Sequence, residues 1–242
     1  MITETPNEGI KRSSKTVIRE FDLPHDCETI TLCIPKIPIK ESIGFRVVKR
    51  SADVAIATTA LAVFSPLLLG TALAIWAEDK GPILYRQKRI GRFGVPFSFY
   101  KFRSMRIDAD RIRAELLHQS DCEGAAFKMK NDPRITKIGR FIRKFSIDEM
   151  PQLFSVLAGH MSIVGPRPHL QEEVDTYSPT QRVRLLVRPG LLCLREIRGR
   201  SHLSFEEWVN FDIEYVREQS LALDAKIFFL AIPAVISARG AY

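Results

Sequence analysis

The longest apolar stretch of the sequence is VAIATTALAVFSPLLLGTALAIW, which runs from Val54 to Trp76 without a charged residue. Its 23 residues would form a straight helix roughly 34 Å long at about 1.5 Å per residue, which is enough to cross a bilayer. Ser65 and Pro66 lie near its middle, where a proline removes an intrahelical hydrogen bond and bends the helix. The stretch therefore predicts a helix-break-helix membrane hairpin whose two arms meet at Ser65 and Pro66.

Basic residues flank this stretch on both sides. Arg46, Lys49 and Arg50 precede it, and four more follow it, namely Arg86, Lys88, Arg89 and Arg92. Basic residues favour the cytoplasmic side of a membrane. Their presence at both flanks therefore favours a re-entrant helix whose two ends lie on that side. A simple membrane span and a buried helix of a soluble protein are the alternatives. Asp53 opens the stretch, and we expect it to pair with Lys49 or Arg50 at the membrane surface.

The composition indicates an anionic partner. The 242 residues suffice for one principal domain with a small appendage, and their formal net charge is +8. Nucleic acid, anionic lipid head groups and nucleotide sugars all suit that charge. The four cysteines include no CxxC pair, so neither a disulfide framework nor a zinc site is predicted. The first 48 residues carry charges throughout, unlike a secretory signal.

The rest of the chain reads as helices with a few short strands. Strands are predicted at residues 29–34 and 191–197, and a β-hairpin at residues 80–104 with its turn at residues 91–94. Amphipathic helices are predicted at 106–120, after residue 134, at 205–220, and at 226–239 along the membrane surface. We therefore expect an α+β fold, mainly helical and membrane-associated. Its parts would be an N-terminal appendage (1–44), the re-entrant hairpin (45–80) and a catalytic domain (81–242).

Two adjacent carboxylates, Asp148 and Glu149, carry the clearest chemical signal. They follow a basic run that consists of Arg134, Lys137, Arg140, Arg143 and Lys144. A carboxylate pair can hold a divalent cation or attack phosphorus, while arginines stabilise phosphoryl oxygens. The alternative is structural, because Ser146 and Glu149 have the spacing of a capping box at a helix start. Since adjacent helical residues point about 100° apart, Asp148 and Glu149 should play different parts.

Further cations can join a phosphate site. Arg167 lies between Pro166 and Pro168, so its backbone is stiff and its side chain can be aimed. Lys101 and Arg103 fall on one face of the predicted strand, because side chains alternate along a strand, and both can then reach the same phosphate. An exposed basic strand edge that deters aggregation is the alternative. The motifs of P-loop, Rossmann, zincin and hydrolase sites are absent from the sequence.

Several segments, in one order over roughly residues 45–242, resemble the bacterial sugar transferases that act as polyprenyl-phosphate hexose-1-phosphate transferases, the small monotopic phosphoglycosyl transferases. The segments are Lys49-Arg50-x-x-Asp53, Ser65-Pro66, Gly81-Pro82, Gln87-x-Arg89-x-Gly91, Lys101-Phe102-Arg103-Ser104-Met105, Asp132-Pro133-Arg134, Ser146-x-Asp148-Glu149-x-Pro151-Gln152, Met161 to Pro168, Pro189-Gly190 and Gly199-Arg200. No single segment would carry the resemblance, but their order makes it specific.

The resemblance implies an enzyme in which Asp148 attacks the sugar-side phosphate of a UDP-sugar, releases UMP and becomes covalently linked to the sugar phosphate. Polyprenyl phosphate, usually undecaprenyl phosphate, would accept that group at the cytoplasmic face of the bacterial inner membrane, in exopolysaccharide, capsule or O-antigen synthesis. Mg²⁺ would be held by Asp148 and Glu149. The family pattern adds Arg143, Lys101 and Arg200 as phosphate-binding residues and Asp212 and Asp224 in support. The predicted phosphate-binding set is then Arg143, Lys101, Arg103, Arg134, Arg167 and Arg200.

The chain also departs from the family pattern. Residues 189–200 read PGLLCLREIRGR, where the family commonly reads Pro-Gly-Ile-Thr-Gly-Leu-x-Gln-Val-x-Gly-Arg, so a glycine and a glutamine are lost. The sequence does not identify the hexose.

Two other functions compete with this interpretation. A basic nucleic-acid-binding protein would use the Gly91–Gly94 turn as a phosphate clamp, but the apolar stretch argues against it. A non-catalytic membrane scaffold of a glycan-assembly complex would not need the Asp148–Glu149 pair. The expected partners are therefore a UDP-sugar, polyprenyl phosphate and membrane lipid, without nucleic acid. Homo-oligomerisation is left open.

Overall fold

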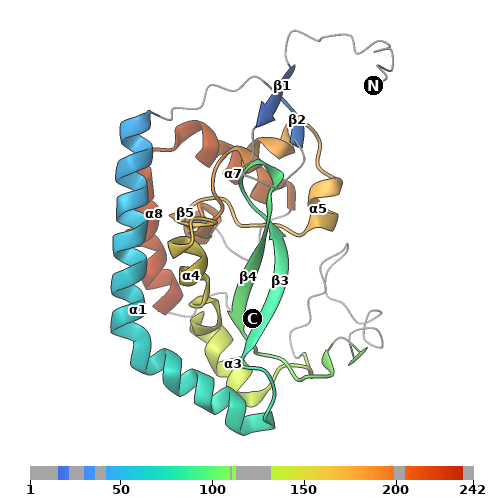
Figure 1. The fold of residues 1–242 in the computed structure, drawn as a ribbon, viewed down its shortest axis with the longest axis vertical. Coiled ribbons are helices and arrows are strands. Elements are labelled where there is room, and N and C mark those ends of the chain that lie inside the picture. Colours follow the sequence, from blue (N-terminus) through green and yellow to red (C-terminus); the bar gives the residue numbers. More distant parts are fainter. Residues whose placement is uncertain are drawn as a thin grey trace, which may run out of the picture.

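The computed structural model describes residues 16–21, 30–35, 42–109, 111–112, 132–198 and 205–236. One long helix, α1 (Ile43–Asp79), runs along one side of the molecule, and the other elements lie to one side of it (Figure 1). The further helices whose bounds the structure gives are α3 (Lys137–Lys144), α4 (Gln152–Leu157), α5 (Gln171–Asp175), α6 (Arg195–Arg198), α7 (Phe205–Glu218) and α8 (Leu221–Ile236). Short 3₁₀ turns lie at η1 (Arg92–Gly94), η3 (Ile147–Glu149) and η4 (Gln181–Leu186).

The described strands form three two-stranded sheets. The pairs β1 (Thr16–Phe21) with β2 (Ile30–Pro35) and β3 (Leu84–Ile90) with β4 (Pro96–Phe102) are antiparallel. The third sheet pairs β5 (Ser162–Val164) and β6 (Gly190–Leu192) in parallel. The mainly helical α+β class and the hairpin at residues 80–104 are thus confirmed.

Other predicted elements turn out differently. The strand predicted at residues 191–197 was wrong over most of its length, because β6 ends at Leu192 and α6 begins at Arg195. The helix predicted at residues 106–120 lies mostly outside the described residues, and β1 was not predicted. The division into three domains remains a prediction.

Helix α1 carries the apolar stretch and is continuous over 37 residues, although Pro66 lies inside it. It changes direction part-way along its length (Figure 1), and Ser65 Oγ donates a hydrogen bond to the carbonyl of Ala62 at 2.9 Å. One face is buried against the rest of the chain, at Asp53, Ala57, Thr71 and Ile75. The opposite face is apolar and exposed along both arms, at Val54, Val63, Phe64, Leu67, Leu69, Leu73 and Trp76. Within the described part of the chain, α1 is the one helix long and apolar enough to cross a membrane.

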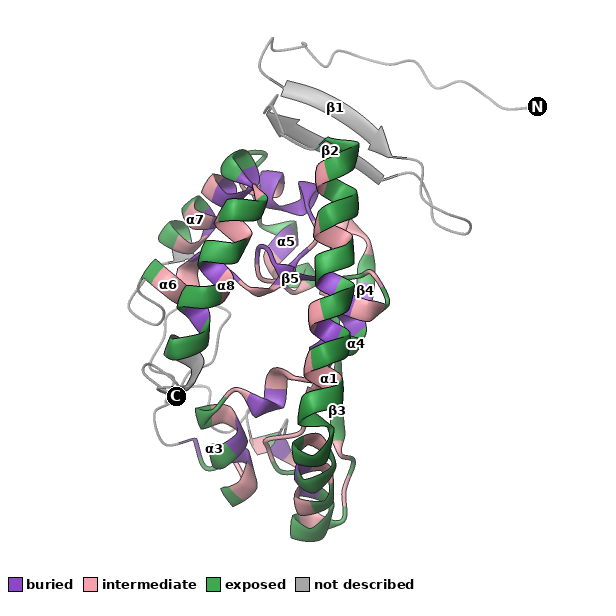
Figure 2. Cartoon of the chain, turned by 90° about the vertical axis from the view of Figure 1, so that its left-hand side faces the viewer, coloured by how far each residue is buried: buried purple, intermediate pink, exposed green. Residues whose placement is uncertain are grey.

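The two arms of α1 pack on separate hydrophobic clusters, and Figure 2 shows buried positions on α1 among exposed ones. Ala57, on the first arm, joins the main core, which includes Val156 of α4, Val164 of β5 and Ile227 of α8. Ile75, on the second arm, joins a smaller cluster with Phe102 of β4, Ile142 of α3 and Ile147 of η3. Each arm therefore supports a different part of the globular domain.

Polar contacts at the first arm differ from those predicted. Lys49 pairs with Asp224 of α8 at 2.6 Å, and Arg50 donates to the carbonyls of Val156 and Leu157 at 2.6 and 2.8 Å. The predicted pairing of Asp53 with Lys49 or Arg50 is therefore wrong. The basic residues are used to hold α8 and the C-terminal end of α4, whose last carbonyls lack helical partners.

The parallel pair of β5 and β6 depends on two glycines. A Cβ atom on Gly190 would lie 2.0 Å from the backbone nitrogen of Gly165. Backbone atoms cannot move aside as a flexible side chain can, so only glycine permits this approach.

We expect Gly190→Ala to destabilise the protein by about 3 kcal/mol or more, or to prevent folding, because the added methyl group overlaps the Gly165 backbone. Gly70→Ala is the matched control, since no atom lies within 4 Å of its Cβ position, and it should change stability by less than about 1 kcal/mol. Thermal unfolding followed by circular dichroism in detergent checks both. Equal midpoints of thermal unfolding for the two variants would contradict this expectation, because β5 and β6 could then move apart without a loss of stability.

Candidate active site

The two adjacent carboxylates lie on η3, a short turn that follows directly from α3. Ser146 joins the two elements with a left-handed backbone, at a φ of 55°, and its side chain makes no capping hydrogen bond. The capping-box interpretation is therefore wrong. Glu149 does not reach back to Ser146, because its carboxylate contacts cations from other elements instead.

Glu149 brings together two cations that are distant in sequence. Its Oε1 lies 3.1 Å from Lys101 Nζ on β4 and 2.6 Å from Arg167 Nη2 on the segment after β5. Burial alone would raise the pKa of this carboxyl group, but the charges and hydrogen bonds of Arg167 and Lys101 outweigh it. The pKa of Glu149 therefore lies far below its ordinary value, and Glu149 stays ionised.

Asp148 has the opposite environment. Its side chain is only 6% exposed, and among the described residues none forms an ion pair with it. Burial and the adjacent charge of Glu149 raise the pKa of Asp148 to about 6, against the lowering effect of Lys101, Arg143 and Arg167. At pH 7 Asp148 is then ionised in about nine-tenths of the molecules, and no side-chain cation among the described residues is paired with it.

The structure brings some of the predicted phosphate-binding residues to this pair and holds others elsewhere. Lys101 and Arg167 touch Glu149, and Arg143 on α3 acts electrostatically on Asp148. Arg103 is paired with Asp79 at the end of α1 and also donates to the carbonyl of Pro82. Lys101 and Arg103 thus have different partners and do not meet at one position. Arg200 lies outside the described residues.

Three further predicted residues lie in buried or half-buried ion pairs. Arg134 is 5% exposed and makes a two-pronged contact with Asp132, with its Nη2 at 2.6 Å from Oδ2. Asp212 of α7 is paired with Arg184 of η4, whereas Asp224 binds Lys49. These contacts stabilise the framework around the site, and none of the three touches Asp148 or Glu149 through a contact that the structure records.

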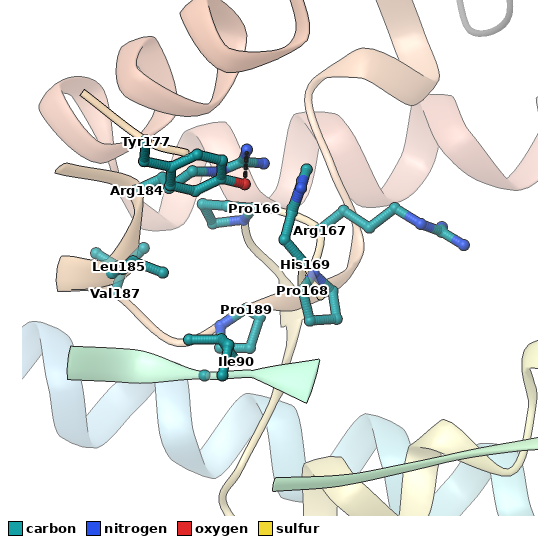
Figure 3. A pocket seen from close by; sticks show the side chains of 11 residues that line it. Ile90, Pro166, Arg167, Pro168, His169, Tyr177, Arg184, Leu185, Val187 and Pro189 are labelled. Carbon is teal, nitrogen blue, oxygen red and sulfur yellow. Dashed lines mark hydrogen bonds between the residues drawn. The ribbon is translucent and has the colours of Figure 1, made fainter. Parts of the chain in front are cut away.

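A small pocket lies on the other side of the segment that carries Arg167. Figure 3 shows Pro166, Pro168 and His169 along one wall, with Tyr177 and Arg184 across from them and the Arg167 side chain extending away. Tyr177 Oη accepts a hydrogen bond from Arg184 at 3.0 Å. Burial lowers the pKa of His169 to about 4, despite Glu173 Oε2 at 3.2 Å from its Nδ1. His169 is therefore neutral at pH 7 and adds no positive charge near Arg167.

Sequence reasoning assigned no role to Gln152 and the wrong partners to Asp53. Gln152 follows the carboxylate pair by three residues, is 2% exposed, and its Nε2 has no hydrogen-bond partner among the described residues. Asp53 contacts β5. Both carry a sequence signal, because each is a polar residue at the edge of an apolar segment.

The sequence profile of the family described as "Bacterial sugar transferase" matches residues 44–238. The chain belongs to the bacterial sugar transferase family. The matched range includes α1, the Asp148–Glu149 pair and every cation placed around it.

Relatives of the chain are named for the transfer of different sugars or for exopolysaccharide production. The galactosyl transferase CpsE of Streptococcus agalactiae is 47% identical over 165 residues, which are 68% of this chain and 37% of that protein. The UDP-glucose:undecaprenyl-phosphate glucose-1-phosphate transferase of Escherichia coli is 38% identical over 196 residues, 77% of this chain and 40% of that protein. The exopolysaccharide production protein ExoY of Sinorhizobium fredii is 41% identical over 198 residues, 80% of this chain and 88% of that protein. The match thus spans about two fifths of the first two relatives and most of the third.

The carboxylates of this bacterial sugar transferase suit a magnesium ion that also binds substrate. The described residues contain no group of three or more His, Cys, Asp or Glu side chains that would enclose a metal by themselves. Mg²⁺ is typically held by one or two carboxylates together with water and substrate phosphates. Asp148 and Glu149 are the residues that would provide the two carboxylates of such a site.

We expect the pKa of Asp148 to move in opposite directions when its two neighbours are changed. Glu149→Gln removes a nearby negative charge and should lower the pKa below about 6, whereas Lys101→Met removes a positive charge and should raise it. Carboxyl ¹³C chemical shifts of labelled Asp, followed against pH, measure both. Shifts in the same direction would contradict this electrostatic account.

Proposed function

We propose that the chain is a phosphoglycosyl transferase that moves a hexose-1-phosphate from a UDP-sugar to undecaprenyl phosphate and releases UMP. The observation that carries the proposal is the unequal environment of the two carboxyl groups. Glu149 is neutralised by Lys101 and Arg167, while Asp148 beside it is ionised at neutral pH without a direct cation partner. The name of the Escherichia coli relative supports the donor and acceptor classes, and that of the Streptococcus agalactiae relative supports the transfer of a sugar.

In the first step, an oxygen of the Asp148 carboxylate attacks the phosphorus that carries the sugar. An O–P bond forms to Asp148 while the bond between that phosphorus and the bridging oxygen of the diphosphate breaks, so UMP leaves with the bridging oxygen. A carboxylate approaches a diphosphate only if positive charge offsets the repulsion between them. Lys101, Arg143 and Arg167 supply that charge around Asp148.

In the second step, a phosphate oxygen of undecaprenyl phosphate attacks the same phosphorus. The O–P bond to Asp148 breaks, the carboxylate is regenerated, and the product is undecaprenyl-diphosphate-sugar. Because UMP leaves before the acceptor reacts, the kinetics should be ping-pong.

We also propose that Mg²⁺ binds at Asp148 and Glu149, where it would neutralise phosphate charge. The membrane part of the proposal is that α1 enters the bilayer from the cytoplasmic face of the bacterial inner membrane, bends, and returns to it. The bend in α1, its exposed apolar face and the basic residues at both ends support this topology.

We expect the detergent-purified protein to release UMP from one UDP-sugar when undecaprenyl phosphate and Mg²⁺ are present. Asp148→Asn should abolish the release, because the amide is not a nucleophile towards phosphorus, and chelation of Mg²⁺ should do the same. A luminescent UMP assay over a panel of UDP-sugars measures this. Folded protein that is silent with every donor would favour a non-catalytic scaffold, and undiminished release by Asp148→Asn would remove Asp148 as the nucleophile.

We expect the rate of UMP release to rise with pH through about 6 and to level off above pH 7. The reaction needs the Asp148 carboxylate, and the pKa of that group is raised to about 6, so protons inhibit below that value. Glu149 stays ionised throughout and adds no second step to the acidic limb. A pH–rate profile under saturating donor checks this, and a rate independent of pH between 5 and 7 would contradict it.

A further inference from the structure

Asp53 on the first arm of α1 contacts the backbone of β5. Its side chain is 4% exposed, and its Oδ1 accepts hydrogen bonds from Ser162 Oγ at 3.0 Å and from the backbone nitrogen of Ile163 at 2.9 Å. Among the described residues no lysine, arginine or histidine forms an ion pair with it. A buried carboxylate is costly unless it is hydrogen-bonded, so these two donors account for its position.

Lys49, one helical turn earlier on α1, contacts the last residue of β5. Its Nζ donates to the carbonyl of Val164 at 3.0 Å and lies 2.6 Å from Asp224 Oδ2 and 3.2 Å from Tyr215 Oη. Tyr215 Oη is in turn 2.7 Å from Asp224 Oδ1 and 3.1 Å from the same carbonyl. Together Asp53 and Lys49 contact every residue of the three-residue strand.

Strand β5 leads directly to Arg167, which is the third residue after Val164. The backbone between them has little freedom. Gly165 donates to the carbonyl of Leu192 at 2.9 Å, and the prolines at 166 and 168 restrict φ on both sides of Arg167. The position of β5 therefore sets the position of the guanidinium group that contacts Glu149 at 2.6 Å.

The second arm of α1 supports the other half of the site. Ile75 packs with Ile142 of α3 and Ile147, which immediately precedes Asp148. Near the same end of α1, Glu78 Oε1 accepts a hydrogen bond from the backbone nitrogen of Lys137, the first residue of α3. The carboxylate pair and Arg167 are thus attached to different arms of one helix.

We propose that Asp53 and Lys49 are positioning residues that act through β5 to hold Arg167 against Glu149. Their role in turnover rests on the proposed function, whereas their role in the geometry does not. If Arg167 moves away from Glu149, the contact at 2.6 Å is lost and a positive charge beside the carboxylate pair is misplaced, so kcat should fall more than the KM for the donor changes.

The matched pair Asp53→Asn and Asp53→Ala tests the proposal. Both hydrogen bonds end on Oδ1, so the asparagine variant keeps an acceptor at that position while it loses the charge. We expect Asp53→Asn to turn over within about threefold of the unmodified protein. Asp53→Ala should show a kcat about tenfold to a hundredfold lower, as misplaced catalytic groups do, with a smaller change in the KM for the UDP-sugar.

A second measurement does not depend on catalysis. Hydrogen–deuterium exchange of the peptide 161–168 should be faster in Asp53→Ala than in Asp53→Asn, because the bond from the backbone nitrogen of Ile163 is lost only in the alanine variant. An alanine variant with unchanged kcat and unchanged exchange would overturn the proposal and leave the proposed function intact. If the unmodified protein released UMP from no donor, the proposed function would fail, and the exchange would still decide the positioning role.

Ser162→Ala provides a milder variant in case Asp53→Ala does not fold. It removes one of the two donors to Asp53 and leaves the backbone bond of Ile163 in place. We expect a smaller fall in kcat and a smaller rise in the exchange of the peptide 161–168. A rate and an exchange identical to those of the unmodified protein would count against the proposal.

Discussion

The ionised carboxylate of Glu149 is the interaction on which the rest of the site depends. It lies on η3 but binds a lysine from β4 and an arginine from the segment after β5, so three parts of the chain meet at one oxygen atom. Its charge also acts on the adjacent residue, because it makes ionisation of Asp148 harder while it takes up the nearest cations. One carboxyl group thus fixes the geometry, and the other is left available to react.

The features that could be predicted from the sequence are those with a local pattern. The apolar stretch, the β3–β4 hairpin and the different environments of Asp148 and Glu149 follow from runs, periods and adjacency within a few residues. The capping box was predicted on the same local basis and was wrong. Glu149 forms two charge-assisted contacts with distant segments, and these are stronger than one hydrogen bond to a neighbouring backbone nitrogen.

The features that could not be predicted depend on distant segments meeting. Strands of three residues such as β5 and β6 have no recognisable pattern, and the contact between Gly165 and Gly190 exists only in the folded chain. The roles of the basic residues were hard to predict for a related reason. The sequence shows how many cations there are but not which of them form ion pairs. Arg134 is engaged by Asp132 only two residues away, which was visible, but the pairing of Arg103 with Asp79 requires the end of α1 to lie beside β4.

The bend in α1 has a consequence for how the surroundings act on the chemistry. Its first arm carries β5 and hence Arg167, and its second arm carries the cluster beneath Asp148. The angle between the two arms therefore affects the distance between Arg167 and Asp148. A lipid bilayer that is thinner or thicker than the apolar arms require strains a helix towards a different tilt or bend. With α1 in the bilayer and Asp148 as the nucleophile, as proposed above, acyl-chain length would affect the spacing between Arg167 and Asp148, and lipid composition would change turnover without any lipid touching a reacting atom.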